Sequence, residues 1–247
     1  MLFLSVFRIF IPLFLLSFFL TAVAFQPGSA PASASAVSPA ELQAQPADEE
    51  GLRIARIKYR GGGDWYNDPS ALSNLIAFTR NEIPISLSRQ YDDVDIGSRR
   101  IHEYPFAFLT GHGNLVINQT EASNLRDYVD NGGFLYIDDD YGFDSYVRTL
   151  IAETFPDDTL IELPANHPIY NQVFSFGNGL PKIHEHDGEA PRGYGIFRDG
   201  RLAVYYTHET NLADGWAYDV HDNPEEKRLA ALRMGVNLLV YAFTSER

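Results

Sequence analysis

Short apolar runs alternate with stretches of helical periodicity from residue 51 onward. The runs at 54–59, 83–87, 106–110 and 134–137 have the length of strands, and turn or acidic residues follow them. A chain in which strands and helices alternate in this way folds into βα units. We therefore predict an α/β fold around a mainly parallel sheet.

The stretches between these runs place apolar residues at helical spacing. Asp68-Pro69 opens the first helix, and we expect Thr120 and Asp144 to cap the second and the third. The last helix begins at Asn223-Pro224, and its apolar stripe continues to Phe243. Each helix therefore has one apolar face to pack against the sheet.

Two late apolar runs, at 195–197 and 202–206, flank Asp199-Gly200. An Asp-Gly pair between two apolar runs is typical of a tight β-hairpin. We therefore expect the α/β domain to end with a hairpin and a helix.

The first 50 residues follow a different pattern. Arg8 precedes the apolar run 9–20, and Ala22-Val23-Ala24 fits the small residues of an export cleavage site. We predict a signal peptide at 1–24 and a location in the periplasm or cell envelope. An uncleaved membrane anchor is the alternative, because the apolar stretch is nearly long enough to span a bilayer. The Ala, Pro and Ser content of 25–51 predicts a disordered linker, which leaves 52–247 as the folded domain.

Charge and cysteine content exclude several function classes. The chain has 33 acidic and 19 basic residues, a formal net charge of -14, and no cysteine. A binder of phosphate backbones needs a basic patch, so nucleic acid is not an expected partner. Without thiols there is no disulfide framework, no cysteine nucleophile and no cysteine-ligated metal site.

Polar residues gather where three of the predicted strands end. Gly61-Gly62-Gly63-Asp64-Trp65 follows the first strand, Gly111-His112-Gly113 the third, and Asp138-Asp139-Asp140 the run at 134–137. The carboxyl ends of parallel strands meet at one edge of a sheet, where ligands bind in open α/β folds. The residues that we expect to bind ligand there are Gly62, Gly63, Asp64, Trp65, Gly111, Gly113 and Asp138.

His112 and the carboxylates are the candidates for chemistry. His112 lies between two glycines, so it is a candidate general base, metal ligand or hydrogen-bond donor, or else a polar turn residue. With Asp139 and His208 it makes the candidate catalytic set. Asp138 and Asp140 are the candidate ligands of a divalent cation, because carboxylate oxygens suit Mg²⁺ and Ca²⁺. The alternative is that these aspartates end the strand and are solvated. No other cofactor is expected.

Two further motifs favour structural roles. His184-Glu185-His186-Asp187 has alternate histidines, as metal sites do, but its Pro and Gly neighbours favour an exposed loop. Trp65, Tyr66 and Trp216 would suit sugar stacking if they were exposed, and the core is the alternative for the two tryptophans.

Four segments in a fixed order resemble one bacterial family. They are 60–66 (RGGGDWY), 110–113 (TGHG), 131–139 (NGGFLYIDD) and 166–170 (NHPIY). The family is an uncharacterised one catalogued as domain of unknown function four-one-five-nine, and the resemblance covers roughly 52–244. It is similar to the class I glutamine amidotransferase-like fold, near the trehalose-utilisation (ThuA-like) branch, which implies a flavodoxin-like three-layer sandwich.

The resemblance also implies a location and excludes an activity. Some relatives are fused behind membrane segments of aerotolerance-type proteins, which implies the cell envelope and a possible membrane-protein partner. The cysteine of true amidotransferases has no counterpart, since the comparable turn is Gly111-His112-Gly113. We therefore expect a module that binds a small polar ligand, a cation or an envelope protein. The alternative is a hydrolase or carbohydrate-active enzyme that uses His112 and Asp138 or Asp139.

Overall fold

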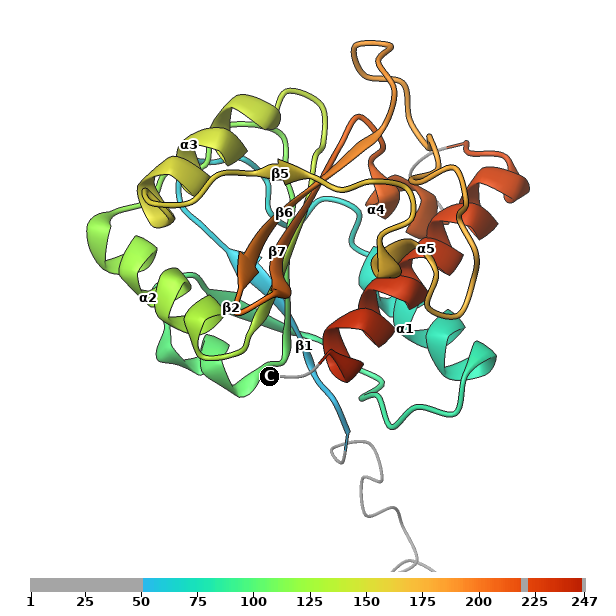
Figure 1. The fold of residues 1–247 in the computed structure, drawn as a ribbon, viewed down its shortest axis with the longest axis horizontal. Coiled ribbons are helices and arrows are strands. Elements are labelled where there is room, and N and C mark those ends of the chain that lie inside the picture. The colour runs from blue at the N-terminus through green and yellow to red at the C-terminus, as the bar shows by residue number, and fades with distance from the viewer. Residues whose placement is uncertain (1–50, 219–221, 246–247) are drawn as a thin grey trace, which may run out of the picture. The chain divides into compact units, whose positions relative to one another are not determined.

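A seven-stranded sheet forms the centre of the computed structural model, which describes residues 51–218 and 222–245 (Figure 1). The predicted signal peptide and all but the last residue of the predicted linker lie outside these ranges. The strands are β1 (Ile54–Lys58), β2 (Asp92–Asp95), β3 (Phe106–Leu109), β4 (Phe134–Asp138), β5 (Ile161–Glu162), β6 (Arg192–Arg198) and β7 (Arg201–His208).

The strand order is β2-β1-β3-β4-β7-β6-β5. The first five strands in this order pair in parallel, whereas β6 and β5 add antiparallel pairs at one edge. The predicted α/β class, the mainly parallel sheet and the hairpin around Asp199-Gly200 are therefore confirmed. The order reverses between β1 and β3, and such a reversal is where open α/β sheets bind ligands.

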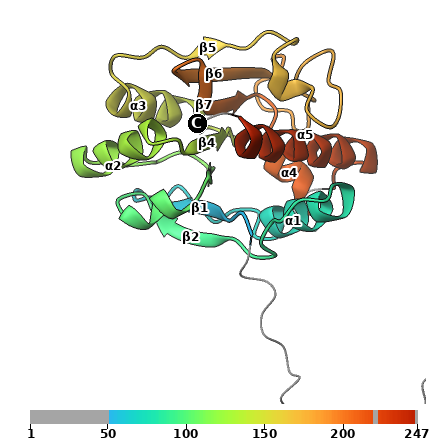
Figure 2. The same cartoon turned by 60° about the horizontal axis from the view of Figure 1, so that its bottom comes forward.

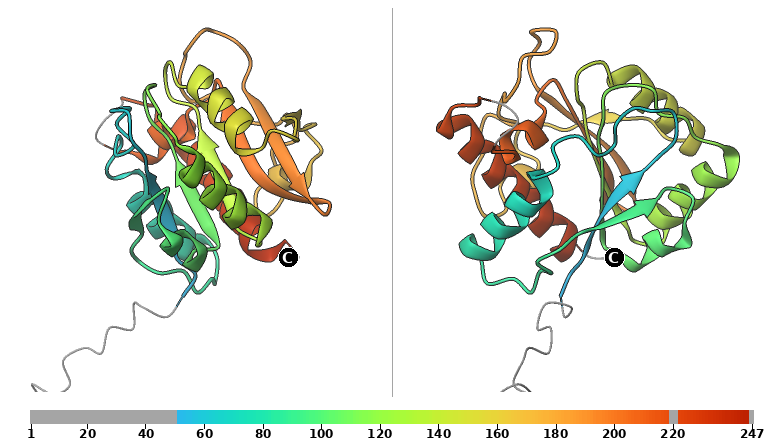
Figure 3. Two further views of the ribbon diagram at one scale, coloured as in Figure 1. Left: turned by 90° about the vertical axis from the view of Figure 1, so that its left-hand side faces the viewer. Right: turned by 180° about the vertical axis from the view of Figure 1, so that it is seen from behind.

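Helices cover both faces of the sheet and make a three-layer structure (Figures 2 and 3). α2 and α3 pack on one face, and α1, α4 and α5 pack on the other. None of the helices in the described ranges combines the length and apolar composition needed to cross a membrane. The helices are α1 (Ala71–Glu82), α2 (Gln119–Asp130), α3 (Asp144–Thr154), α4 (Leu212–Trp216) and α5 (Glu225–Thr244), with short 3₁₀ turns at η1 (Arg99–Glu103) and η2 (Pro168–Tyr170).

Each central strand contributes side chains to two separate cores. On β4, Phe134 and Tyr136 join the core under α1 and α5, whereas Leu135 and Ile137 join the core under α2 and α3. Alternate strand residues face opposite sides, so a strand covered on both faces is a continuous apolar run. Trp216 lies in the first core with no exposed surface. Of the two roles considered for this tryptophan, burial in the core is therefore correct and sugar stacking is not.

The second strand differs from the prediction. Residues 83–87 were expected to form it, but they make only one bridge, between Leu87 and Leu52, and Pro84 has no N–H to donate. The acidic segment Asp92–Asp95 forms the edge strand instead. On this edge only Val94 is buried, and Arg53, Arg56 and Lys58 lie 2.6, 2.8 and 3.8 Å from Asp92, Asp93 and Asp95. Charge pairing across the edge thus replaces apolar burial.

Two helix starts also differ from the prediction. Asn118, not Thr120, caps α2: its side chain accepts from the Glu121 N–H, and the Glu121 carboxylate accepts from the Asn118 N–H. Asp144 is the first residue of α3, and its carboxylate accepts from Arg148 instead of capping the helix. Several polar residues near each start have the chemistry of a cap, and the position of the chain decides which one serves.

We predict that Asn237→Ala lowers the free energy of unfolding by about 2–3 kcal/mol. Asn237 lies on α5 with no exposed surface, where its Oδ1 accepts from the backbone N–H groups of Val173 and Phe174, both at 2.9 Å. The substitution leaves these donors without their partner. Denaturant unfolding measures the loss, and the exposed Asn81→Ala on α1 is the control, with an expected change below about 0.5 kcal/mol. Equal changes in the two variants would contradict this role.

Candidate functional site

The carboxyl ends of the parallel strands bring most of the predicted polar residues to one edge. Asp64 follows β1, His112 follows β3, Asp139 and Asp140 follow β4, and His208 ends β7. Three groups of contacts form there: His112 with Asp64 and Asp140, a set of buried carboxylates around Asp140, and Asp139 with His208. The three predicted catalytic residues are therefore divided between two of these groups.

Close packing explains two of the glycines in the predicted binding loops. A Cβ on Gly63 would lie 1.8 Å from the carbonyl oxygen of Gly113, and a Cβ on Gly111 would lie 1.9 Å from the Tyr59 hydroxyl. That hydroxyl lies 2.5 Å from the Gly63 carbonyl oxygen and joins the two loops. The Gly111 φ of 148° also favours glycine. These loops therefore touch directly, which sets Asp64 beside His112.

His112 is held between two carboxylates. Its Nδ1 lies 3.0 Å from Asp64 Oδ2, its Nε2 lies 3.1 Å from Asp140 Oδ1, and its backbone N–H donates to Asp64. The hydrogen bond to Asp140, reinforced by the contact with Asp64, raises the pKa of His112 to about 9. The ring is therefore an imidazolium at neutral pH, with both N–H groups donating. This geometry disfavours the predicted role of general base, which needs a free lone pair, and both N–H donors are already engaged with Asp64 and Asp140.

Asp140 belongs to a cluster of three buried carboxylates. Asp68, Asp140 and Asp214 each place one oxygen within 4.8 Å of the others, and they are 5%, 3% and 1% exposed. The amides of Asn67 and Asn211 donate to Asp140. Burial and the neighbouring Asp68 and Asp140 raise the pKa of Asp214 to about 9, so the cluster keeps a proton at neutral pH. Carboxylate oxygens in this arrangement suit a divalent cation.

Asp138 points into the fold. It is fully buried, and its carboxylate accepts from Thr207 Oγ1 at 2.7 Å, from the Ala213 N–H at 2.7 Å and from the Leu212 N–H at 3.2 Å. Burial raises the pKa of Asp138 to about 6. The side chain therefore holds the start of α4 against β4. It was predicted to bind ligand and, with Asp140, a cation, but it is not among the three clustered carboxylates, of which only Asp140 was predicted.

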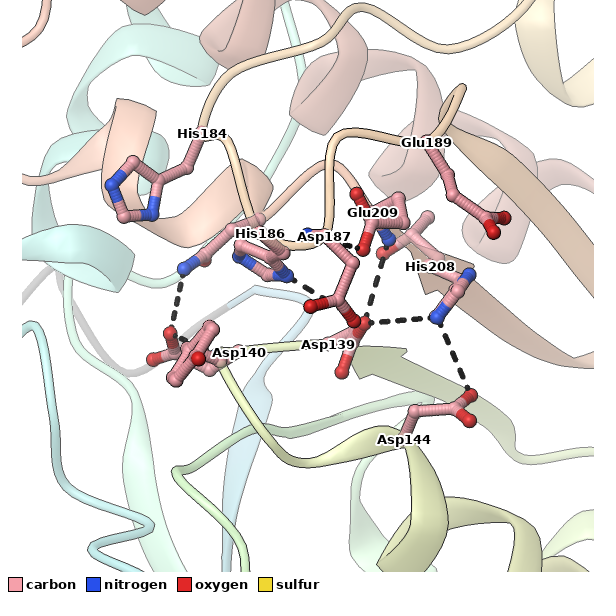
Figure 4. A network of polar contacts seen from close by, with 12 residues as sticks. Asp139, Asp140, Asp144, His184, His186, Asp187, Glu189, His208 and Glu209 are labelled. Atoms are coloured by element: carbon pink, nitrogen blue, oxygen red, sulfur yellow. Dashed lines mark hydrogen bonds and ion pairs between the residues drawn. The ribbon is translucent and has the colours of Figure 1, made fainter.

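Asp139 lies between two imidazoles (Figure 4). Its Oδ2 is 3.6 Å from His208 Nε2 and 3.8 Å from His186 Nδ1, and the His208 nitrogen is also 3.6 Å from Asp144 Oδ1. These separations are longer than hydrogen bonds. Asp139 Oδ1, His186 Nε2 and His208 Nδ1 are buried and have no hydrogen-bond partner. Buried polar groups without partners are rare, so this group can take further donors and acceptors.

The sequence analysis did not predict three residues of the site: His186, Asp68 and Asp214. The segment around His186 was expected to be an exposed loop, which is wrong for His186 itself, because its side chain is 3% exposed against Asp139. The alternating histidines at 184 and 186 were the available signal. Asp68 resembled a helix start, and Asp214 lies within α4 with no motif around it.

The aromatic residues lie at the border of the site. Trp65 packs under the cationic groups of Arg56 and Lys58, at 5.1 and 5.5 Å from its ring centroid. Tyr66 is 57% exposed, and Tyr141, directly after Asp140, is 61% exposed. Their exposed rings border the acidic edge, whereas Trp65 is partly covered by its charged neighbours.

We predict that His112→Gln removes a stabilisation that depends on pH. The folded-state pKa of His112 is raised from 6.5 to about 9, so its contribution is complete below pH 6.5 and is lost as the pH rises through 9. The variant should be about 1 kcal/mol less stable than wild type near pH 6, where the imidazole is charged and the carboxylates are still ionised; this is the size typical of a partly exposed ion pair. The two proteins should converge above the folded pKa. Denaturant unfolding across this pH range measures the difference, and a constant difference would contradict the ion pairing.

The comparisons with known proteins agree with the resemblance predicted from the sequence motifs. A search of curated proteins found no match. A family model described as a domain of unknown function, DUF4159, matches residues 53–243, which include β1 and all but the last residue of α5. The chain therefore belongs to the DUF4159 family.

Proposed function

We propose that this domain is an exported binding module of the cell envelope, and that its strand-end edge binds a divalent cation, alone or as part of a small polar ligand. The observation that carries the proposal is the cluster of Asp68, Asp140 and Asp214, three buried carboxylates with oxygens within 4.8 Å of one another. Carboxylates are expensive to bury unless a positive charge accompanies them.

The chemistry of the cluster favours a hard cation. Its ligand atoms are all oxygens, which Mg²⁺ and Ca²⁺ prefer. Near neutral pH a proton on Asp214 relieves the repulsion, and a divalent cation would do so more completely by compensating two charges. The unpartnered atoms around Asp139 supply hydrogen-bonding groups for the polar remainder of a ligand.

The sequence supports the location and limits the partners. The apolar N-terminal segment followed by Ala22-Val23-Ala24 supports export, and the acidic net charge of -14 disfavours nucleic acid. A small polar ligand is the first partner that we propose. An envelope protein, including one in the membrane, is the partner that would receive the ligand-bound domain.

We predict that Asp140→Asn and Asp214→Asn abolish the stabilisation of the protein by Mg²⁺, Ca²⁺ or Mn²⁺. Each substitution replaces a carboxyl group that can ligate a cation by an amide of nearly the same volume. Because Asp214 keeps a proton at neutral pH, its asparagine variant should unfold within about 1 kcal/mol of wild type when no cation is present. Thermal unfolding and calorimetric titration with each cation measure both effects.

Asp157→Asn is the matched control for these variants. Asp157 is exposed in the loop after α3, outside the cluster. It should keep the wild-type shift in melting temperature with each cation. The proposal is wrong if wild type is not stabilised by any of the three cations, or if Asp157→Asn and Asp140→Asn lose the same stabilisation.

A hydrolase is the second candidate, and the Asp139 group favours it. A carboxylate between His208 and His186, with unpartnered atoms on all three side chains, can accept and return a proton. Contacts of 3.6–3.8 Å are typical of catalytic groups that tighten when substrate binds.

If the domain is a hydrolase, Asp139→Asn should lower kcat by about 100-fold or more on any ester or glycoside that it cleaves. The measurement is a panel of chromogenic esters and glycosides, with Asp157→Asn as the control. Turnover that survives in Asp139→Asn would exclude this carboxylate as the proton carrier.

A further inference from the structure

A segment between η2 and β6 crosses the acidic edge and brings basic side chains to its buried acids. We call residues 182–190 the strap. Lys182 Nζ lies 2.7 Å from Glu209 Oε2, His184 Nδ1 lies 3.3 Å from Asp214 Oδ2, and His186 Nδ1 lies 3.8 Å from Asp139 Oδ2. The three acidic side chains are 1%, 1% and 4% exposed. Each basic residue of the strap thus faces a different buried acid. Figure 4 shows His186 beside Asp139.

Polar contacts hold the outer part of the strap in place. Ile183 is buried in the core and anchors the beginning of the segment. From 184 to 190 every residue is exposed except His186. The Asp187 N–H donates to Glu209 Oε1 at 3.0 Å, and Lys182 Nζ donates to the Glu189 carbonyl oxygen at 2.9 Å. A segment with so little apolar burial opens at a low free-energy cost.

The strap and a cation would share one residue, Asp214. His184 contacts Asp214 Oδ2, and Asp214 is one of the three clustered carboxylates. His186 covers Asp139 in the neighbouring group. A cation bound to Asp214 would therefore compete with the contact between His184 and Asp214, and an open strap would uncover Asp139.

We propose that the strap competes with the cation and its polar ligand, because His184 and His186 occupy the places that these would take. This inference rests on the cation site proposed above. Cation binding and strap opening are then linked, and the linkage is reciprocal. A closed strap lowers the affinity for the cation, and a bound cation exposes the strap and the Asp139 group. The same movement would let a polar ligand reach Asp139 and His208.

The test is the double variant His184→Gln/His186→Gln in the full chain, with His102→Gln on η1 as the control. Glutamine keeps polarity and similar bulk without a basic ring. Calorimetric titration with Mg²⁺, Ca²⁺ and Mn²⁺ at one fixed pH gives the affinities. Thermal unfolding without cation checks that each variant is folded.

We expect the double variant to bind a cation at least about 5-fold more tightly than wild type, a difference within the range typical of linked sites. His102→Gln should bind like wild type. A second measurement needs no variant: a glutamate-specific protease should cleave after Glu185 and Glu189, both exposed on the strap, faster when the cation is present.

Other outcomes would overturn it in distinguishable ways. Weaker binding by the double variant would make the imidazoles ligands, and unchanged affinity with unchanged cleavage would make the strap a passive cover; both leave the cation site intact. Absence of binding in wild type and in the double variant would overturn the cation site and the strap proposal together.

Discussion

The burial of several carboxylates at one edge of the sheet is the constraint on which the rest of the site depends. Asp138, Asp139, Asp140 and Asp214 are at most 3% exposed, and each needs donors or positive charge to remain there. Asp138 accepts hydrogen bonds from backbone N–H groups at the start of α4, and Asp140 accepts them from His112 and two amides. Asp139 accepts one 3.4 Å hydrogen bond from the Glu209 N–H and otherwise has only longer contacts with imidazoles. The differences among these partners separate structural from chemical roles.

The strand order explains why the acids converge. β1, β3 and β4 lie side by side, so the loops that follow them meet at one end of the sheet. The strand order reverses between β1 and β3, and in open α/β sheets a crevice lies outside the strand ends at such a reversal. Glycine contacts bring the first two loops together, and β7 adds His208 and the start of α4. The predicted site residues therefore gather at this edge, with His112 in the turn after β3.

The strap supplies basic side chains to the buried acids at this edge. Lys182, His184 and His186 reach Glu209, Asp214 and Asp139 from a segment with little apolar burial. Acids that face basic groups are less costly to bury than isolated acids. If the proposed cation site is correct, stability without the cation and affinity for it both depend on Asp214.

The sequence by itself determined the α/β class, the late hairpin, the family and the edge at which Asp64, His112, Asp139 and Asp140 gather, because periodicity and strand-end position are local properties of the chain. It did not determine β2, where charge pairs with β1 replaced apolar burial. Nor did it reveal that Asp138 turns inward, or that Asp68, Asp214 and His186 join the site. Those contacts link residues far apart in the chain, so only the tertiary packing decided them.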